Sequence, residues 1–281
     1  MRVIKKKCLF IFILFLLSFS ELFAQYEFLY NEEDVYYYEQ NGTSRFWFKT
    51  SDIVEFYDHG NDIRKTATYS IEHEYNVPFL NLNWDDGTSY RYLMLVNRSI
   101  MLLYADNTMP KWDLRSRTSG ADGVPPTLVT MGNISASSTL IEGNSNYSAT
   151  PERLGLHINS AWAVEGGVGE RLHITPRGQA ADGLEISIGY VHFSQHYLFQ
   201  YNARPKKIRI IDGEDESIFF DVELLDTPNF QYISYSTRSD EGWWTSRINN
   251  RGKVIIEILE VFPGTRYNHM CINGIFSWFS M

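Results

Sequence analysis

Cysteine is almost absent from this sequence of 281 residues, which contains only Cys8 and Cys271. Cys8 falls in an N-terminal segment that we expect to be removed, so a fold held by disulfides is excluded. Stability must then come from the burial of apolar side chains, and about 257 mature residues are enough for two modest cores. Cys271 is predicted to be a small buried side chain, because an exposed thiol is reactive in an oxidising compartment.

Basic residues are also scarce, since 25 Lys and Arg stand against 34 Asp and Glu, a net charge of −9. Removal of residues 1–24 takes away four basic residues and Glu21, which leaves 21 basic against 33 acidic residues, or −12. Such a surface repels phosphate backbones, and no basic stripe interrupts it. We therefore expect no nucleic-acid partner.

Long apolar runs are missing after the N-terminus. Arg2 and three lysines precede the apolar run 8–17, and Leu22-Phe23-Ala24 is a plausible cleavage site. This pattern predicts a secretory signal peptide over residues 1–24. A membrane anchor needs roughly 20 apolar residues, so this run is too short, and no later run is long enough to cross a membrane. We expect an exported protein, periplasmic or extracellular or at the cell surface, with no transmembrane segment.

Helical periodicity is lacking as well, and between residues 25 and 105 short strands alternate with turns. The alternation is clearest at 79–84, where Leu80, Leu82 and Trp84 share one face. Asp86-Gly87 then supplies the positive φ angles of a tight hairpin. Further strands are predicted at 46–48, 53–57 and 90–95. The fold class is therefore all-β, and we predict that residues 25–105 form a small antiparallel β-meander that curls into a half-barrel.

Residues 106–127 change in character, because their second half is small and polar and ends in Pro125-Pro126. This composition predicts a linker. Eight further strands follow it, at 128–130, 169–174, 184–188, 206–211, 217–224, 230–233, 253–261 and 272–276. Turn signals roughly every dozen residues, with no intervening helix, predict a two-sheet β-sandwich over 128–281.

Six sequence blocks in this second half carry a resemblance when they are taken in order. They are 135–140 with Tyr147, 161–170, 188–190, 201–208, 224–231 and 261–272. Together they resemble the NADase-type glycan-binding domain, a discoidin-like member of the galactose-binding fold, over about 150 residues. The resemblance implies a jelly-roll sandwich that binds carbohydrate. The sequence departs from the family pattern by one extra residue in 162–166 and by a long loop at 191–199, which puts ligand specificity in doubt more than the fold.

Loops at one end of such a sandwich form its recognition surface, because a rigid scaffold with variable loops is where binding residues tend to lie. The candidate ligand-binding residues are Trp162, Glu165, Tyr190, Asn202, Arg204 and Tyr267. The rings offer a sugar an apolar face, and the polar side chains offer hydrogen bonds to its hydroxyls. Three of these residues have a structural alternative: Trp162 as a core ring, Arg204 as a partner of Glu165 or Asp226, and Tyr267 as part of a turn.

Metal-binding patterns are incomplete. His192 and His196 have the i, i+4 spacing of zinc ligands but no apparent third ligand. The acidic segment 212–216 resembles a calcium loop without its closing glutamate, and a charged hairpin tip is the alternative. We expect no metal, cofactor or catalytic residue, although galactose-binding-like folds often carry a structural calcium, which the resemblance leaves open.

The features of the sequence favour a secreted or periplasmic, non-catalytic protein whose partner is a carbohydrate or glycoconjugate. An envelope protein that docks onto another protein through the same loops is the first alternative. An enzyme is the second, since the family takes its name from its occurrence beside an NAD-hydrolysing domain. Residues 25–105 contain no recognisable acid–base set, and the chain has no phosphate loop or nucleophile elbow, so we expect no enzymatic activity.

Overall fold

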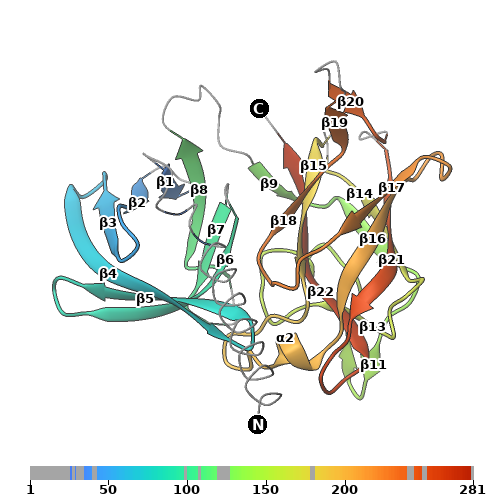
Figure 1. The fold of residues 1–281 in the computed structure, drawn as a ribbon, viewed down its shortest axis with the longest axis horizontal. Helices are drawn as coiled ribbons and strands as arrows, with labels where there is room; N and C mark the ends of the chain where they lie inside the picture. The colour runs from blue at the N-terminus through green and yellow to red at the C-terminus, as the bar shows by residue number, and fades with distance from the viewer. Residues whose placement is uncertain are drawn as a thin grey trace, which may run out of the picture.

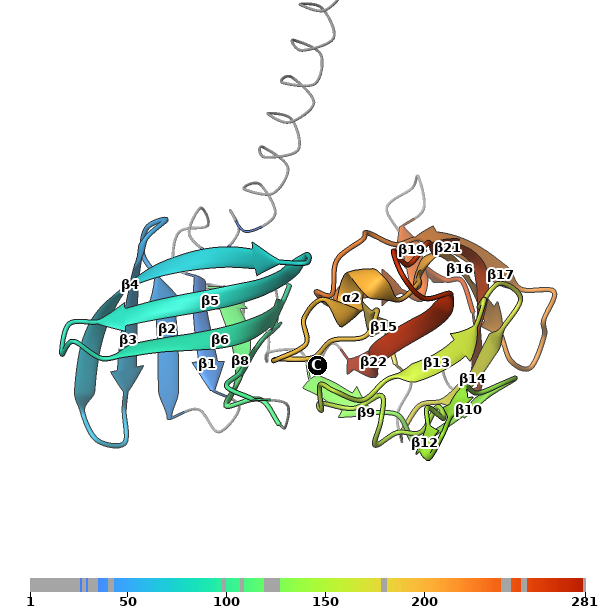
Figure 2. The same cartoon turned by 90° about the horizontal axis from the view of Figure 1, so that it is seen from below.

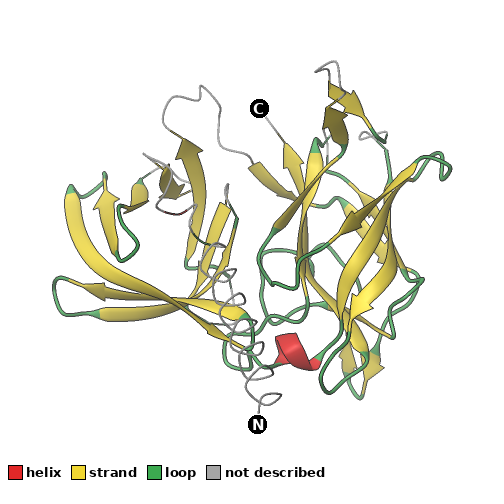
Figure 3. Cartoon of the chain, in the orientation of Figure 1, coloured by secondary structure: helices red, strands yellow, loops and turns green. Residues whose placement is uncertain are grey.

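The structure is a computed structural model, and it is all-β as the sequence predicts (Figure 1). It describes residues 26, 29, 35–39, 43–97, 100–106, 109–118, 127–177, 181–238, 244–248 and 252–279, and the predicted signal peptide lies outside this range. Figure 3 shows that the described residues are mostly strands joined by loops, together with the short helix α2 (Leu198–Tyr201). None of the helices in the described part of the chain is long and apolar enough to span a membrane.

Eight antiparallel strands close into a barrel in the N-terminal half. They are β1 (Val35–Glu39), β2 (Ser44–Phe48), β3 (Ile53–Asp58), β4 (Ile63–Glu74), β5 (Val77–Trp84), β6 (Ser89–Val96), β7 (Ile100–Tyr104) and β8 (Trp112–Thr118). The predicted half-barrel is therefore corrected to a closed one. Closure comes from β8, which pairs with β7 on one side and with β1 on the other.

The barrel also corrects the boundary of the predicted linker. Residues 106–127 begin inside the barrel, because β8 occupies 112–118 and places Leu114 in its core. In the described part of β8, one buried leucine and the partly buried Trp112 stand among polar residues and carry little periodicity, so the sequence does not predict this strand. Residues 119–126, the Pro-terminated part of the predicted linker, lie outside the described residues.

The interior of the barrel is filled by side chains that alternate along the strands. Leu80 and Leu82 of β5 are buried there with Trp84 packed beside them, as the sequence predicts. Aromatic rings supply much of the volume, for example Phe48, whose ring meets that of Tyr69 edge to face at 5.0 Å. Such edge-to-face pairs are a favoured arrangement of aromatic side chains.

The C-terminal half contains two five-stranded sheets that enclose one apolar core, so it is sandwich-like. The first sheet has the order β10 (Asn133–Ala136), β14 (Arg171–Thr175), β21 (Val254–Phe262), β16 (Arg204–Asp212) and β17 (Phe219–Glu223). The second contains β13 (Trp162–Glu165), β22 (His269–Phe279), β15 (Gly183–Ile188) and β18 (Gln231–Ser234), with β9 (Thr127–Thr130) also paired to β22.

Two small hairpins complete this half: β11 (Ile141–Glu142) with β12 (Ser145–Asn146), and β19 (Ser236–Arg238) with β20 (Trp244–Ser246). Figure 1 places β11, β13 and α2 at the same end of the molecule, at the bottom of the view. The candidate site described below is built around these three elements.

The barrel and the sandwich share a third apolar cluster. Phe79 and Leu102 of the barrel are buried together with Phe199, Phe230 and other side chains of the sandwich. Polar contacts cross the same junction: the Tyr104 hydroxyl donates to the carbonyl of Leu156 at 2.8 Å. The two halves are therefore packed together through a largely apolar interface, and α2 lies against the β4–β5 turn (Figure 2).

Candidate functional site

A pocket of about 300 Å³ opens on the outer face of the second sheet. Its floor consists of Ala163 on β13 and Cys271 on β22, which are directly opposite each other in the antiparallel ladder. Both side chains point away from the sandwich core, whereas their neighbours Trp162, Val164 and Ile272 point into it. Small side chains at two facing positions leave room above the sheet, and this room is the pocket.

Tyrosine rings form much of the wall around this floor. Tyr147 follows the β11–β12 hairpin and Tyr190 follows β15, and their rings meet edge to face at 6.3 Å. Tyr267 stands on the loop between β21 and β22, 36% exposed, with its ring parallel to that of His269 at 5.9 Å. The pocket therefore presents both faces and edges of aromatic rings to an incoming molecule.

Hydrogen-bonding groups are placed between these rings. Gln195, Asn202 and His269 line the pocket, and Glu142 lies 3.6 Å from the Nδ1 atom of His269. The Asn202 amide nitrogen donates to the Leu198 carbonyl at 2.9 Å, which fixes the side chain against α2. A concave apolar surface with a few fixed polar groups is the usual form of a small-ligand site.

Burial shifts the titration of the Tyr190 phenol to higher pH. The ring is packed against Tyr147, and this desolvation, more than the nearby charges, raises the pKa of Tyr190 to about 12. Its hydroxyl donates to the side-chain oxygen of Asn159 at 3.2 Å. Cys271 is buried, as predicted, and desolvation raises the pKa of its thiol well above the ordinary value. A thiol held in this protonated form is a poor nucleophile, so Cys271 contributes volume and shape rather than reactivity.

The structure brings together three of the six predicted site residues, because Tyr190, Asn202 and Tyr267 all line this pocket. Glu165 lies close by on β13, opposite His269 in the ladder, but it is exposed and does not line the pocket. Tyr267 also has the structural role in a turn that the sequence offered as its alternative, since its backbone N–H donates to the carbonyl of Tyr201 at 2.8 Å.

Trp162 is placed in the sandwich core and offers no face to a ligand. Its exposure is 0%, and its indole N–H donates to the carbonyl of Ser138 at 3.0 Å. This is the core role that the sequence left open. The reason is the alternation along β13, because Trp162 and Val164 share the inward face while Ala163 faces the pocket.

Arg204 is likewise turned inward, with only 5% of its surface exposed. Its guanidinium makes two hydrogen bonds to the carboxylate of Asp226, at 2.6 and 2.9 Å, which is the pairing named as its structural alternative. It also donates to the carbonyls of Phe199 and Asn202 at 3.0 and 2.7 Å. Arg204 thereby satisfies carbonyls in and just beyond α2, and it positions the helix that carries one wall of the pocket.

Two glycines allow the loops to approach this closely. A Cβ atom at Gly264 would stand 2.2 Å from the Tyr267 carbonyl oxygen and 2.5 Å from that of Tyr201. Gly189, with φ of +84°, would push a Cβ atom into the ring of Phe199 at 2.6 Å. Any side chain at these two positions would collide with its neighbours, which is the physical reason for glycine in both loops.

The histidine pair before α2 does not converge on a common point. His192 accepts hydrogen bonds from the backbone N–H groups of Ser194 and Gln195, whereas the Nε2 atom of His196 lies 2.6 Å from Glu74 on the barrel. No cluster of three or more His, Cys, Asp or Glu side chains suited to a metal ion occurs among the described residues.

The acidic segment 212–216 lies at the turn between β16 and β17. Asp212 accepts backbone hydrogen bonds from Glu214 and Asp215, and Asp215 accepts one from Ser217. These carboxylates are therefore engaged in shaping a charged hairpin tip, which was the alternative to a calcium loop.

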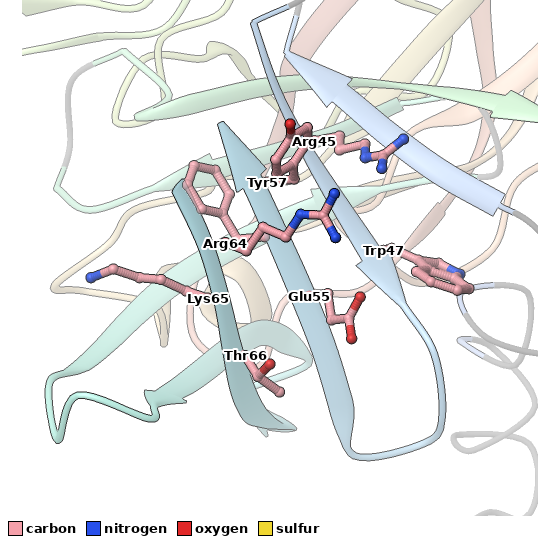
Figure 4. Close-up of a pocket in the computed structure, with 8 residues that line it drawn as sticks. Arg45, Trp47, Glu55, Tyr57, Arg64, Lys65 and Thr66 are labelled. Atoms are coloured by element: carbon pink, nitrogen blue, oxygen red, sulfur yellow. The ribbon is translucent and has the colours of Figure 1, made fainter. Parts of the chain in front are cut away.

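A second pocket lies on the outer wall of the barrel, over β2, β3 and β4 (Figure 4). The guanidinium carbons of Arg45 and Arg64 lie 5.2 and 4.8 Å from the centre of the Tyr57 ring. Glu55 pairs with Lys49, and Lys65 pairs with Asp86, each at 2.6 Å. Because so many of its charged groups already have partners within the barrel, we rank this surface below the sandwich pocket. A third, more open pocket lies farther along the barrel wall at Ser70, Glu72, Asn81, Asn83, Ser89, Tyr90 and Arg91.

Several pocket residues were not singled out from the sequence as site residues. Tyr147 appeared only within a family block, and Gln195 appeared only within the histidine segment. Leu140 and His269 likewise appeared only within family blocks, and Glu142 carried no signal, because the positions of the β11–β12 hairpin and of β22 around the pocket depend on the whole fold. The alternation along 161–165 is the one pattern that points to Ala163 as an outward-facing residue between two core side chains.

Comparison with known proteins gives no family assignment, since no family model and no curated protein matches this sequence.

Proposed function

We propose that this chain is an exported, non-catalytic carbohydrate-binding protein, and that its site is the tyrosine-lined pocket on the sandwich. The observation that carries the proposal is the composition of that pocket: Tyr147, Tyr190 and Tyr267 surround a floor of small side chains. Pyranose rings have an apolar face and hydroxylated edges. Aromatic walls match the face, and the fixed polar groups of Asn202 and His269 match the edges.

The sandwich is proposed to be a galactose-binding-like jelly roll of the discoidin type, which is the architecture implied by the family resemblance. Its two antiparallel sheets around a single core are consistent with that assignment. The resemblance and the pocket are independent arguments, because the pocket follows from geometry alone. Residues 1–24 would direct the chain to the periplasm or the cell exterior.

Titration calorimetry of the purified protein against a panel of mono- and oligosaccharides tests the proposal. We expect at least one saccharide to bind, and Tyr267→Ala to weaken that binding by about tenfold because a stacking ring is lost. Tyr232→Ala is the matched control, since Tyr232 is also well exposed but lies on β18, outside the pocket. An equal loss of affinity in both variants, or the absence of binding by every saccharide, would contradict the assignment of this pocket as the saccharide site.

A protein partner is the second candidate, and exposed apolar side chains favour it. Ile141 at the hairpin beside the pocket and Val168 in the loop after β13 are 68% and 62% exposed. Large apolar side chains exposed near a cleft are typical of interfaces. Co-purification of a stoichiometric partner that is lost on Ile141→Asp, with no saccharide bound, would favour this function instead.

A further inference from the structure

A row of aromatic rings leads out of the sandwich pocket and onto the barrel. It starts at Tyr267 and His269 in the pocket, continues through Tyr201 and Tyr197 on or beside α2, and ends at Tyr75 in the β4–β5 turn. The ring centres of Tyr267 and Tyr201 are 6.3 Å apart, and so are those of Tyr201 and Tyr75. The row is thus continuous across the junction of the two halves.

The rings of the row remain accessible. Tyr75 is 45% exposed, and Tyr197 and Tyr201 are partly exposed. The guanidinium of Arg266 lies 5.6 Å from the centre of the Tyr201 ring and 5.3 Å from that of Tyr267. The row therefore also contains a hydrogen-bonding group beside two of its rings.

Tyr75 occupies a backbone conformation that disfavours its own side chain. It forms a two-residue turn with Asn76, and the two have φ angles of +54° and +65°, which is the geometry of a type I′ hairpin. Asn and Gly are preferred at both positions, and a tyrosine there costs stability. The turn itself does not require this large ring, which is partly packed against Tyr197 and Tyr201 and still leaves a surface for a partner.

The end of the row is held in place relative to the pocket. His196, just before α2, lies 2.6 Å from Glu74, the neighbour of Tyr75 on the barrel. The shared apolar cluster of the barrel and the sandwich lies beneath this contact. In both Figure 1 and Figure 2 the turn between β4 and β5 is next to α2. A ligand that extends from the pocket over α2 therefore meets Tyr75 without any rearrangement of the two halves.

We propose that the ligand is an oligosaccharide chain rather than a single sugar, and that the barrel supplies an outer subsite through Tyr75. This inference rests on the proposed function, since it extends the same site. Ring-to-ring spacings near 6 Å are comparable with the advance of a glycan chain from one pyranose to the next. Each ring then offers a face or an edge to one unit of the chain.

The test compares matched monomers and hexamers in titration calorimetry with the full chain: glucose and cellohexaose, N-acetylglucosamine and chitohexaose, and galacturonic acid and its α-1,4 hexamer. We expect one hexamer to bind at least tenfold more tightly than its monomer. Tyr75→Asn should weaken that hexamer by about three- to tenfold, the loss of one ring contact, and leave the monomer unchanged. Asparagine suits the turn, so this variant should fold, and Tyr75→Phe should retain wild-type affinity.

Tyr90→Ala is the control, because Tyr90 is 50% exposed on the barrel wall and lies outside the row. Unchanged hexamer affinity in Tyr75→Asn, while Tyr267→Ala still weakens binding, overturns the outer subsite and leaves the proposed function standing. A fall in thermal stability of Tyr75→Asn without any change in affinity assigns the ring to the junction of the two halves and also overturns the subsite. Absence of binding by all six probes overturns the proposed function and the outer subsite together.

Discussion

Replacement of Arg204 by methionine separates a structural role from a ligand contact at this position. The side chain is almost fully buried, and its guanidinium makes four hydrogen bonds, two to the Asp226 carboxylate and one each to the carbonyls of Phe199 and Asn202. Methionine keeps the length of the side chain but removes every donor. Arg204→Met therefore leaves one carboxylate and two carbonyls without these partners.

The expected cost follows from the burial of each group. Loss of one partner from a fully buried ion pair costs about 3–5 kcal/mol. The Asp226 side chain is 33% exposed, so solvent screens part of its charge and the contribution of the pair must be discounted. The two carbonyls add a desolvation cost, and we expect the free energy of unfolding to fall by about 2–4 kcal/mol in total.

Urea unfolding followed by tryptophan fluorescence measures this change, with the midpoint compared at constant slope. The double variant Arg204→Met with Asp226→Asn should lose less free energy of unfolding than the sum of the two single variants, because both groups of the ion pair are removed together. A change below about 0.5 kcal/mol in Arg204→Met would refute the reasoning. Saccharide affinity that vanishes while stability is kept would identify Arg204 as a ligand contact instead.

Three further predictions concern the same fold. Gly264→Ala should lower the free energy of unfolding by about 2 kcal/mol in urea melts, since its Cβ atom would meet two backbone oxygens; a neutral change would contradict the tight turn. Burial, and secondarily the charge of His196, lowers the pKa of His192 below its ordinary 6.5. Below pH 6.5 the unfolded chain therefore binds more protons at His192 than the folded protein does, and the free energy of unfolding falls with the pH. His192→Asn should reduce that loss between pH 7 and 5, and an unchanged pH profile would exclude His192 as its source. Tyr104→Phe removes the hydrogen bond to the Leu156 carbonyl and should lower the free energy of unfolding by about 1 kcal/mol. Two separate transitions in calorimetry of this variant would show that the two halves unfold separately.

Strand positions were the most predictable part of the molecule. The alternation of Leu80, Leu82 and Trp84 predicted both a strand and its buried face, and Gly87 predicted the hairpin that follows. β4 was not predicted because half of its residues are exposed at the barrel wall and only Ala67 and Tyr69 are fully buried, so polar side chains dominate its sequence. Local composition cannot predict a strand that is stabilised mainly by ladders on both sides.

The candidate site was predictable only in part, for a similar reason. Tyr190 and Asn202 lie in loops, where binding residues concentrate, and the structure places both in the pocket. Trp162 and Arg204 have equally suitable chemistry, but both point inward. The pleat of β13 places Trp162 in the core, and Arg204 donates hydrogen bonds to the carbonyls of Phe199 and Asn202. The direction of a side chain depends on register and packing, which a single sequence does not contain.

The sequence by itself determined that this chain is an all-β protein with a Pro-terminated break between two sets of strands, because alternation and turn residues act over a few neighbouring positions. Only the tertiary structure decided that β8 closes the barrel, that two small side chains on facing strands open a pocket, and that Tyr75 stands in line with it. These features join residues that are far apart along the chain, so they arise from long-range packing.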